Sequence, residues 1–398
     1  MQTVPVNIAN TLARLAENYV LVKVDCPEGH IDFTSNDYLG VVKNRIGEEP
    51  DAYQDLPHGA TSVRLLTGTH PIHLAFEKWC ANFYEGEAAM LFGSGFSANL
   101  GVIEAVAQRG DVILYDKLIH ASLRDGVRLS LARNFSFEHN DFTDLRNKLM
   151  RLKPEKGGDV FVIVESLYSM DGDLTDMVSL TNLCEEFGAY LIVDEAHSTG
   201  VYGEQGKGWC HEQGVHHRIF ARIYTFGKGI GRKGAVVVTS ESVNRFLVNR
   251  CHTFIYSTAF SPSEVSRIWA ALQATAFMDK ARKRLFELSD FANHWFAKIP
   301  GVCFEPNNSP LKPIFIGGSS VAVTNKLVQI LKQEGIIARI VLSPVVPPGT
   351  ERIRIALHSY NTEAEILQVY HILTQPQIQQ LLHASTPLPF VETVCETV

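Results

Sequence analysis

Short apolar runs recur along the first part of the chain, and they constrain its fold more than any other feature. Six runs have the length of buried strands: residues 88–92, 112–115, 160–165, 190–194, 222–226 and 235–239. Segments with a helical pattern, such as 97–108 and 177–187, lie between them. This alternation predicts an α/β fold with a mostly parallel sheet, because strands that are covered by helices on both faces are apolar throughout.

The C-terminal part of the chain has a different pattern. Shorter strands (314–316 and 352–357) mix with helices (325–334 and 363–373), which predicts a smaller α+β domain. We therefore expect an N-terminal segment (1–45), a large domain (46–285) and a small C-terminal domain (286–398). The tail after Gln375 contains prolines and is expected to lie on the surface.

Composition and charge argue against several classes of function. Of the 398 residues, 45% are hydrophobic and 20% are charged, which is typical of a folded protein. No apolar run approaches the roughly 20 residues of a membrane-spanning helix. A net charge of −7 argues against a nucleic acid or an anionic membrane as partner. Seven scattered cysteines without a C-x-x-C pair, and an N-terminus without an export signal, predict a cytoplasmic protein.

Two glycines follow the first predicted strand. Gly93 and Gly95 permit a tight turn, after which the backbone N–H groups of Gly95 and Phe96 begin a helix. A helix N-terminus of this kind is a ready site for an anion such as phosphate. The same segment also fits a dinucleotide fingerprint with Asp116 as its acid, which would indicate a nicotinamide dehydrogenase. A tight turn without any ligand is the third interpretation.

A carboxylate ends another apolar run. Asp194 ends the predicted strand 190–194, and His197 comes three residues later. A buried carboxylate is unfavourable unless it meets a cation, and a protonated pyridine nitrogen is one such cation. A metal site made by Asp194 and His197, or an ordinary helix cap, would explain the same residues.

A lysine lies among glycines after the strand 222–226. Lys228 is flanked by Gly227 and Gly229, so a ligand can approach its amine closely, and Thr225 offers a hydroxyl nearby. Partial desolvation would make the amine nucleophilic. Alone, this segment fits a surface lysine in a glycine loop better. Together, a phosphate site, an aspartate and a lysine at strand ends of one sheet are what pyridoxal phosphate requires.

The sequence resembles the α-oxoamine synthase family of fold-type I pyridoxal phosphate enzymes. The resemblance covers roughly residues 30 to 375, and it is closest to members of the biotin pathway. Its matching segments are residues 35–40, 58–68, 93–99, 116–126, 165–173, 194–208, 225–231, 256–262 and 351–357. It implies a large domain that binds the cofactor, a smaller C-terminal domain and an N-terminal segment that closes over the site.

The resemblance also implies a role for individual residues around the cofactor ring. Lys228 would bond the cofactor's aldehyde and later move the substrate's α-proton. Asp194 would pair with the ring nitrogen, His197 would bond the phenolic oxygen, and His120 would stack on the ring. Ser169 would line the ring, with Glu165 as its neighbour.

Further residues are implied for the phosphate and the substrate. The N–H groups of Gly95 and Phe96 and the Thr225 hydroxyl would hold the phosphate. Thr258 would reach it from a neighbouring subunit, which implies a homodimer with shared active sites. Arg354 would bind the substrate carboxylate, and Asn36 lies in the segment that closes over the site. Arg352, two residues before Arg354 on the same strand, is interpreted as a surface charge.

The implied reaction is the condensation of an amino acid with an acyl thioester and loss of carbon dioxide. L-alanine and a pimeloyl group, carried by coenzyme A or acyl carrier protein, would give 8-amino-7-oxononanoate. Leu342 and Asn361 stand where many biotin-pathway members have arginine and histidine. Alternatives within the family are glycine with an acetyl thioester, serine with a long acyl chain, or synthesis of an autoinducer-type aminoketone. A catalytically silent scaffold is disfavoured by the intact Lys228.

Overall fold

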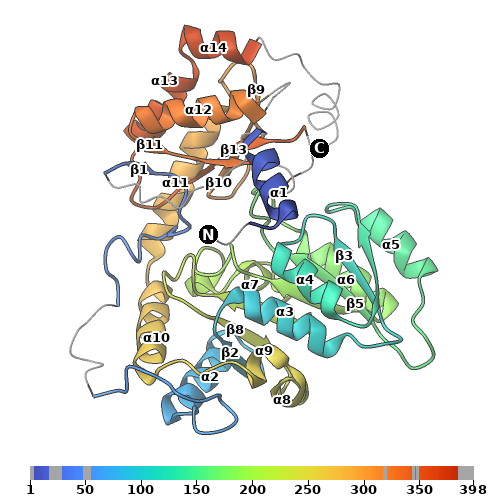
Figure 1. Cartoon of the computed structure of the whole chain (residues 1–398). Helices are drawn as coiled ribbons and strands as arrows, with labels where there is room; N and C mark the ends of the chain where they lie inside the picture. The colour runs from blue at the N-terminus through green and yellow to red at the C-terminus, as the bar shows by residue number, and fades with distance from the viewer. Residues whose placement is uncertain are drawn as a thin grey trace. The chain divides into compact units, whose positions relative to one another are not determined.

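The computed structural model describes residues 4–17, 29–47, 55–316, 321–342, 346 and 349–383 of the chain (Figure 1). The chain divides into two compact units. Unit 1 consists of Met1–Ser35, Met170–Gly172 and Arg284–Val398, and unit 2 of Asn36–Ser169 and Asp173–Lys283. The three ranges expected from the sequence stay a prediction. Within the described residues, no helix has the length and apolar composition needed to cross a bilayer.

Unit 2 is built on a sheet with the strand order β2-β8-β7-β6-β5-β3-β4. The strands are β2 (Ala88–Phe92), β3 (Val112–Asp116), β4 (Arg133–Phe137), β5 (Val160–Glu165), β6 (Tyr190–Asp194), β7 (Ala221–Thr225) and β8 (Ala235–Thr239). Only β8 runs against its neighbours β2 and β7. The predicted α/β fold with a mostly parallel sheet is therefore confirmed.

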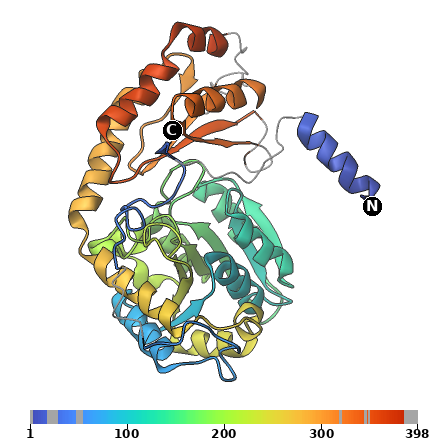
Figure 2. The same ribbon diagram turned by 60° about the vertical axis from the view of Figure 1, so that its left-hand side comes forward.

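Helices cover both faces of this sheet, as Figures 1 and 2 show. They are α2 (Pro71–Phe83), α3 (Gly95–Val106), α4 (Ala121–Leu129), α5 (Phe142–Arg151), α6 (Met177–Phe187), α7 (Trp209–Glu212), α8 (Glu241–Arg250), α9 (His252–Ile255), α10 (Pro262–Ala276) and the first residues of α11 (Asp279–Phe296), with 3₁₀ turns η2 (Glu204–Gly206) and η3 (His216–Arg218). Along β3, Ile113 packs into the core on one face of the sheet, while Val112 and Leu114 pack into the core on the other. Burial on both faces explains why these strands are apolar throughout.

Unit 1 contains a smaller antiparallel sheet of order β12-β13-β10-β9. Its strands are β9 (Val302–Cys303), β10 (Leu311–Ile316), β12 (Arg339–Val341) and β13 (Arg352–Ala356), and a parallel pair joins β1 (Ile31–Asp32) to β11 (Ile336–Ile337). Its helices are α1 (Val6–Glu17), the rest of α11, α12 (Val321–Gln333), α13 (Glu363–Leu373) and α14 (Pro376–His383).

Two expectations about unit 1 are wrong. The segment after Gln375 is not simply a surface tail, because it forms α14 and buries Ile378 and Leu382; residues 384–398 lie outside the described residues. Arg352 is not a surface charge, because it is 3% exposed, pairs with Asp171 and packs over the Phe315 ring at 4.3 Å. A position in a central strand of a sheet has little access to water, and this burial requires the charge to be paired.

Candidate active site

The carboxyl ends of β5, β6 and β7 meet at one edge of the unit 2 sheet. Glu165 ends β5 directly opposite Asp194, which ends β6, and Thr225 ends β7. Parallel strands place these ends side by side, and the glycine turn between β2 and α3 reaches the same edge because Phe92 and Thr225 both pair with Ala235. The candidate residues predicted at strand ends are therefore brought together.

The start of α3 and the end of β7 form an anion site. Ser94 caps the helix by accepting from the Ser97 N–H at 3.1 Å, which leaves the N–H groups of Gly95 and Phe96 without a partner in the helix ladder. The Thr225 side chain packs directly against Gly95, where a Cβ atom would lie 2.5 Å from the Thr225 methyl carbon. The buried Thr225 hydroxyl has no hydrogen-bond partner within the described part of the chain. Two N–H groups and an unsatisfied hydroxyl suit a phosphate.

Asp194 is held by a buried network. It is 4% exposed, and its Oδ2 accepts from Asn99 Nδ2 at 2.6 Å while its Oδ1 accepts from the Ala196 N–H at 2.8 Å. The Asn99 amide also donates to Ser122 Oγ at 3.0 Å. The carboxylate is thus fixed in orientation by neutral donors, which leaves it suited to a cationic ligand.

His120 begins α4 and is linked to the same network. Its Nδ1 lies 2.7 Å from Ser122 Oγ, and its backbone N–H donates to Glu165 Oε1 at 2.6 Å. The pKa of His120 is below its ordinary value because neighbouring atoms desolvate the ring; Asp194 opposes this effect and Lys228 adds to it. The side chain remains exposed on one side, so a ring can lie against it.

Glu165 is a buried carboxyl with an altered pKa. It is 3% exposed, and burial together with repulsion from Asp194 raises its pKa well above the ordinary range, while Lys228 acts in the opposite direction. Burial therefore favours the uncharged form of the Glu165 carboxyl. The electrostatic effect of Lys228 on both Glu165 and His120 brings the amine into the same cluster.

Lys228 lies in a loop that is closed by backbone hydrogen bonds. The Lys228 carbonyl accepts from the Gly231 N–H at 2.8 Å, and the Phe226 N–H donates to the Gly234 carbonyl at 2.9 Å. Gly229 lies so near the Thr199 carbonyl that a Cβ atom there would be 2.5 Å from its oxygen. The half-buried lysine is therefore carried by a tightly packed turn.

His197 is oriented by a tyrosine from an early part of the chain. Its Nδ1 lies 2.6 Å from the hydroxyl of Tyr38, which donates to Asn36 Oδ1 at 3.2 Å. His197 is 4% exposed and Tyr38 is fully buried. Asn36 thus joins the site indirectly, through Tyr38.

For the other predicted residues, the structure gives a location in the fold. Ser169 is buried after β5. Thr258 is exposed and forms a bridge with Val63, so its predicted reach into a neighbouring subunit stays a prediction. Arg354 is buried on β13 in unit 1, and its role also stays a prediction.

The structure answers two of the alternative interpretations. Asp116 is fully buried and binds His139 at 2.9 Å and the Asn140 N–H, so its carboxylate does not serve a dinucleotide ribose. Asp194 and His197 do not belong to a three-residue metal-ligand group in the described part of the chain. The anion site, the buried Asp194 carboxylate and Lys228 at one sheet edge suit an organic cofactor with a phosphate and a cationic nitrogen.

Sequence reasoning assigned no role to Asn99, Ser122 and Tyr38. Asn99 and Ser122 are polar residues on otherwise apolar faces of α3 and α4, and both are buried. A polar residue at a core position was the available signal, because such a residue must find a partner. Tyr38 gave no such signal, because a buried tyrosine is common in cores.

Comparisons with known proteins agree with this site. The sequence profile of the aminotransferase class I and II family matches residues 28–372. The chain is 35% identical over 352 residues to an 8-amino-7-oxononanoate synthase from Marinobacter nauticus, covering 87% of this chain and 86% of that relative. Among solved structures, a serine palmitoyltransferase from Sphingomonas wittichii has a TM-score of 0.84 at 26% identity, covering 96% of this chain and 98% of that one. An 8-amino-7-oxononanoate synthase from Francisella tularensis has a TM-score of 0.73 at 26% identity, covering 89% and 99%.

Proposed function

Because the chain belongs to the aminotransferase class I and II family and, within it, to the α-oxoamine synthases, we propose that it condenses L-alanine with a pimeloyl thioester to 8-amino-7-oxononanoate. The chain is a pyridoxal phosphate-dependent C-acyltransferase. The likeness to a synthase of that name, at 35% identity across most of both chains, is the observation that carries the choice of reaction.

The cofactor explains the unusual groups at the sheet edge. Its phosphate would accept from the Gly95 and Phe96 N–H groups and from the Thr225 hydroxyl, which otherwise lacks a partner among the described residues. When bound, pyridoxal phosphate supplies an electron sink next to the amino acid's α-carbon. Asp194 would keep the proton on the ring nitrogen, since two neutral donors hold its carboxylate in a fixed orientation.

We assign the remaining roles in the same proposal. Lys228 anchors the cofactor and takes the α-proton of the amino acid. His120 packs on the cofactor ring with its exposed side, and His197, oriented by Tyr38, bonds the ring oxygen. Ser169 lies beside the ring. The role of His120 uses the neutral imidazole that its surroundings favour.

The proposal extends to the substrates and the assembly. Arg354 would bind the carboxylate of the amino acid through a two-pronged pair, and Asn36 would help close the site. Thr258 would complete the phosphate site of a partner chain in a homodimer. We also propose a cytoplasmic location, with no nucleic acid or membrane as partner. Either coenzyme A or acyl carrier protein could deliver the acyl group.

A second candidate reaction joins L-serine to a long acyl chain. The serine palmitoyltransferase from Sphingomonas wittichii matches 96% of this chain with a TM-score of 0.84. Leu342, where many biotin-pathway members have arginine, removes a cation that would favour a carboxylate-ended acyl chain. An apolar residue at position 342 can instead pack against a hydrocarbon acyl chain that has no terminal carboxylate.

A panel of substrates distinguishes the two reactions. Purified enzyme loaded with pyridoxal phosphate is given L-alanine, glycine or L-serine with pimeloyl, acetyl or palmitoyl thioesters, and the products are identified by mass. We expect the highest kcat/KM for L-alanine with the pimeloyl thioester and loss of carbon dioxide. Highest efficiency with L-serine and palmitoyl thioester would reject the proposal. Lys228→Ala is the control and should give no product with any pair.

A further inference from the structure

A second group of donor atoms lies at the other edge of the unit 2 sheet, near the amino ends of its strands. Glu85 follows α2, His211 is on α7 and His216 begins η3. Arg222, the second residue of β7, donates to the Glu85 carbonyl and so fixes this position. The group is therefore separate from the candidate active site at the carboxyl ends.

The three side chains converge. His211 Nε2 lies 3.0 Å from Glu85 Oε1, and His216 Nε2 lies 3.2 Å from Glu85 Oε2. The two imidazoles stack with their centroids 4.4 Å apart, so at least one ring must turn before both Nε2 atoms can direct their lone pairs at one ion. Each side chain contributes one possible ligand atom, and these three atoms lie within 4.8 Å of one another.

These separations suit a metal ion. Zinc binds imidazole nitrogen and carboxylate oxygen at about 2.0–2.2 Å, and tetrahedral bonds of that length put neighbouring ligand atoms roughly 3.4 Å apart. Two nitrogens and one carboxylate are also a ligand set that zinc-type ions use with a fourth position left open. We propose that Glu85, His211 and His216 bind a divalent transition-metal ion of the zinc type, with water as the fourth ligand.

The backbone at Glu85 agrees with this proposal. Glu85 has a φ of 53°, in the left-handed region where glycine is the usual residue after a helix. Glycine at this position would relieve the conformation but would remove the carboxylate. The same fact supplies a mild test variant, because Glu85→Gly deletes a ligand without disturbing the turn.

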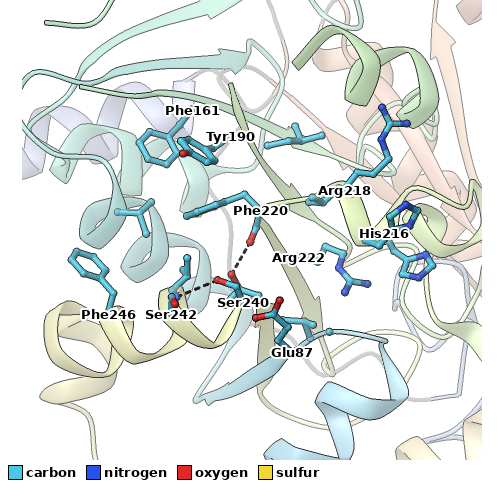
Figure 3. Close-up of a pocket in the computed structure, with 18 of the residues that line it drawn as sticks. Glu87, Phe161, Tyr190, His216, Arg218, Phe220, Arg222, Ser240, Ser242 and Phe246 are labelled. Atoms are coloured by element: carbon cyan, nitrogen blue, oxygen red, sulfur yellow. Dashed lines mark hydrogen bonds between the residues drawn. The ribbon is translucent and has the colours of Figure 1, made fainter. Parts of the chain in front are cut away.

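The open position of the ion would face a cavity. Glu85 and His216 both line a cavity of about 920 Å³. Figure 3 shows His216 beside Arg218 at one end of this cavity, with Phe161 and Tyr190 at the other end. A water molecule or a small anion therefore has room to complete the coordination.

Lys207 competes with the ion. Its Nζ donates to Glu85 Oε1 at 2.6 Å, and its side chain is largely buried, so it holds a positive charge next to the proposed site. The ion must displace this ammonium group from Oε1. Removing the charge should therefore strengthen metal binding, whereas a cluster that serves only as an ion-pair network makes no such prediction.

The test is a competition titration of the pyridoxal phosphate-loaded enzyme with Zn²⁺ against a chromophoric chelator. We expect one ion per chain, and a Kd that is weakened at least about tenfold in His211→Ala, His216→Ala and Glu85→Gly. Lys207→Gln should tighten the Kd. The exposed neighbour His217, whose ring is 5.4 Å from that of His216, is the matched control, and His217→Ala should leave the Kd unchanged.

A second measurement controls for loss of the fold. Each variant must keep the wild-type cofactor content and far-ultraviolet spectrum. Co²⁺ in place of Zn²⁺ should give visible absorption bands of a four-coordinate site in the wild type, His217→Ala and Lys207→Gln, and in none of the variants that lack a ligand. Less than one ion per chain, equal weakening by His217→Ala, or weaker binding by Lys207→Gln would each overturn the proposal.

Discussion

His139 carries a partly buried positive charge, and its contribution to stability can be tested against pH. Its Nδ1 lies 2.9 Å from Asp116 Oδ1, and its Nε2 lies 2.7 Å from Asp173 Oδ2. Both ring nitrogens therefore face carboxylates, and both must carry protons to donate. Although burial lowers the pKa of His139, the hydrogen bonds to Asp116 and Asp173 outweigh it and raise the pKa from 6.5 to about 10.

The size of this effect sets the expected loss of stability. Each tenfold change in proton affinity equals about 1.4 kcal/mol, so a rise from 6.5 to about 10 sets an upper limit of about 5 kcal/mol. Removing one partner of a buried ion pair costs about 3–5 kcal/mol, since the other partner stays buried without compensation. We expect His139→Gln to lower the free energy of unfolding by about 3–5 kcal/mol below pH 6.5.

The pH dependence has a definite sign. The folded-state pKa is higher than the unfolded value, so the stabilisation is complete below pH 6.5 and is lost as the pH rises through about 10. The assay is urea unfolding of both proteins between pH 6 and 10, at one protein concentration and saturating cofactor. His217→Gln, on an exposed histidine, is the control. A gap between wild type and His139→Gln that stays constant across this range, or that is below about 1 kcal/mol at pH 6.5, would refute the reasoning.

Three further changes test the candidate site. Asn99→Ala removes the 2.6 Å hydrogen bond to Asp194, and a hydrogen bond to a charged group contributes about 1.5–3 kcal/mol. Steady-state kinetics should therefore show kcat/KM reduced about 10- to 100-fold. Unchanged kinetics would contradict the role of Asn99. Thr225→Val keeps the shape of the side chain but deletes its hydroxyl. Fluorescence titration should show cofactor affinity weakened roughly five- to tenfold, while the cofactor-free protein keeps its stability. A cofactor affinity equal to that of the wild type would exclude the hydroxyl from the phosphate site. Tyr38→Phe removes the 2.6 Å contact with His197 and should reduce kcat/KM roughly fivefold while leaving cofactor content unchanged; loss of cofactor instead would assign Tyr38 a different role.

The sequence predicted the sheet well where burial on both faces makes a strand apolar. Residues 160–165, 190–194 and 235–239 form strands with the predicted ends. Strand β4 (Arg133–Phe137) was missed because it lies at the sheet edge, where four of its five residues are exposed and polar residues are tolerated. Helix α14 was missed because it begins with a proline and is rich in polar residues, so its short apolar face is evident only from the packing.

The site was predictable to the extent that it lies at strand ends. Asp194 and Thr225 end strands of one parallel sheet, so topology alone places them at the same edge. The partners that orient them come from distant segments: Asn99 reaches Asp194 from 95 positions away, and Tyr38 reaches His197 from 159. No local pattern encodes such pairs, and they follow only from the folded structure.

The central claim is that the Lys228 amine holds pyridoxal phosphate at the edge where Asp194 ends β6. The most direct measurement is borohydride reduction of the cofactor-loaded enzyme, followed by protease digestion and mass spectrometry. We predict one pyridoxyl-phosphate adduct per chain, located on Lys228 and absent from Lys228→Ala. An adduct that maps to another lysine, or no adduct on a protein saturated with the cofactor, would contradict this account of the site.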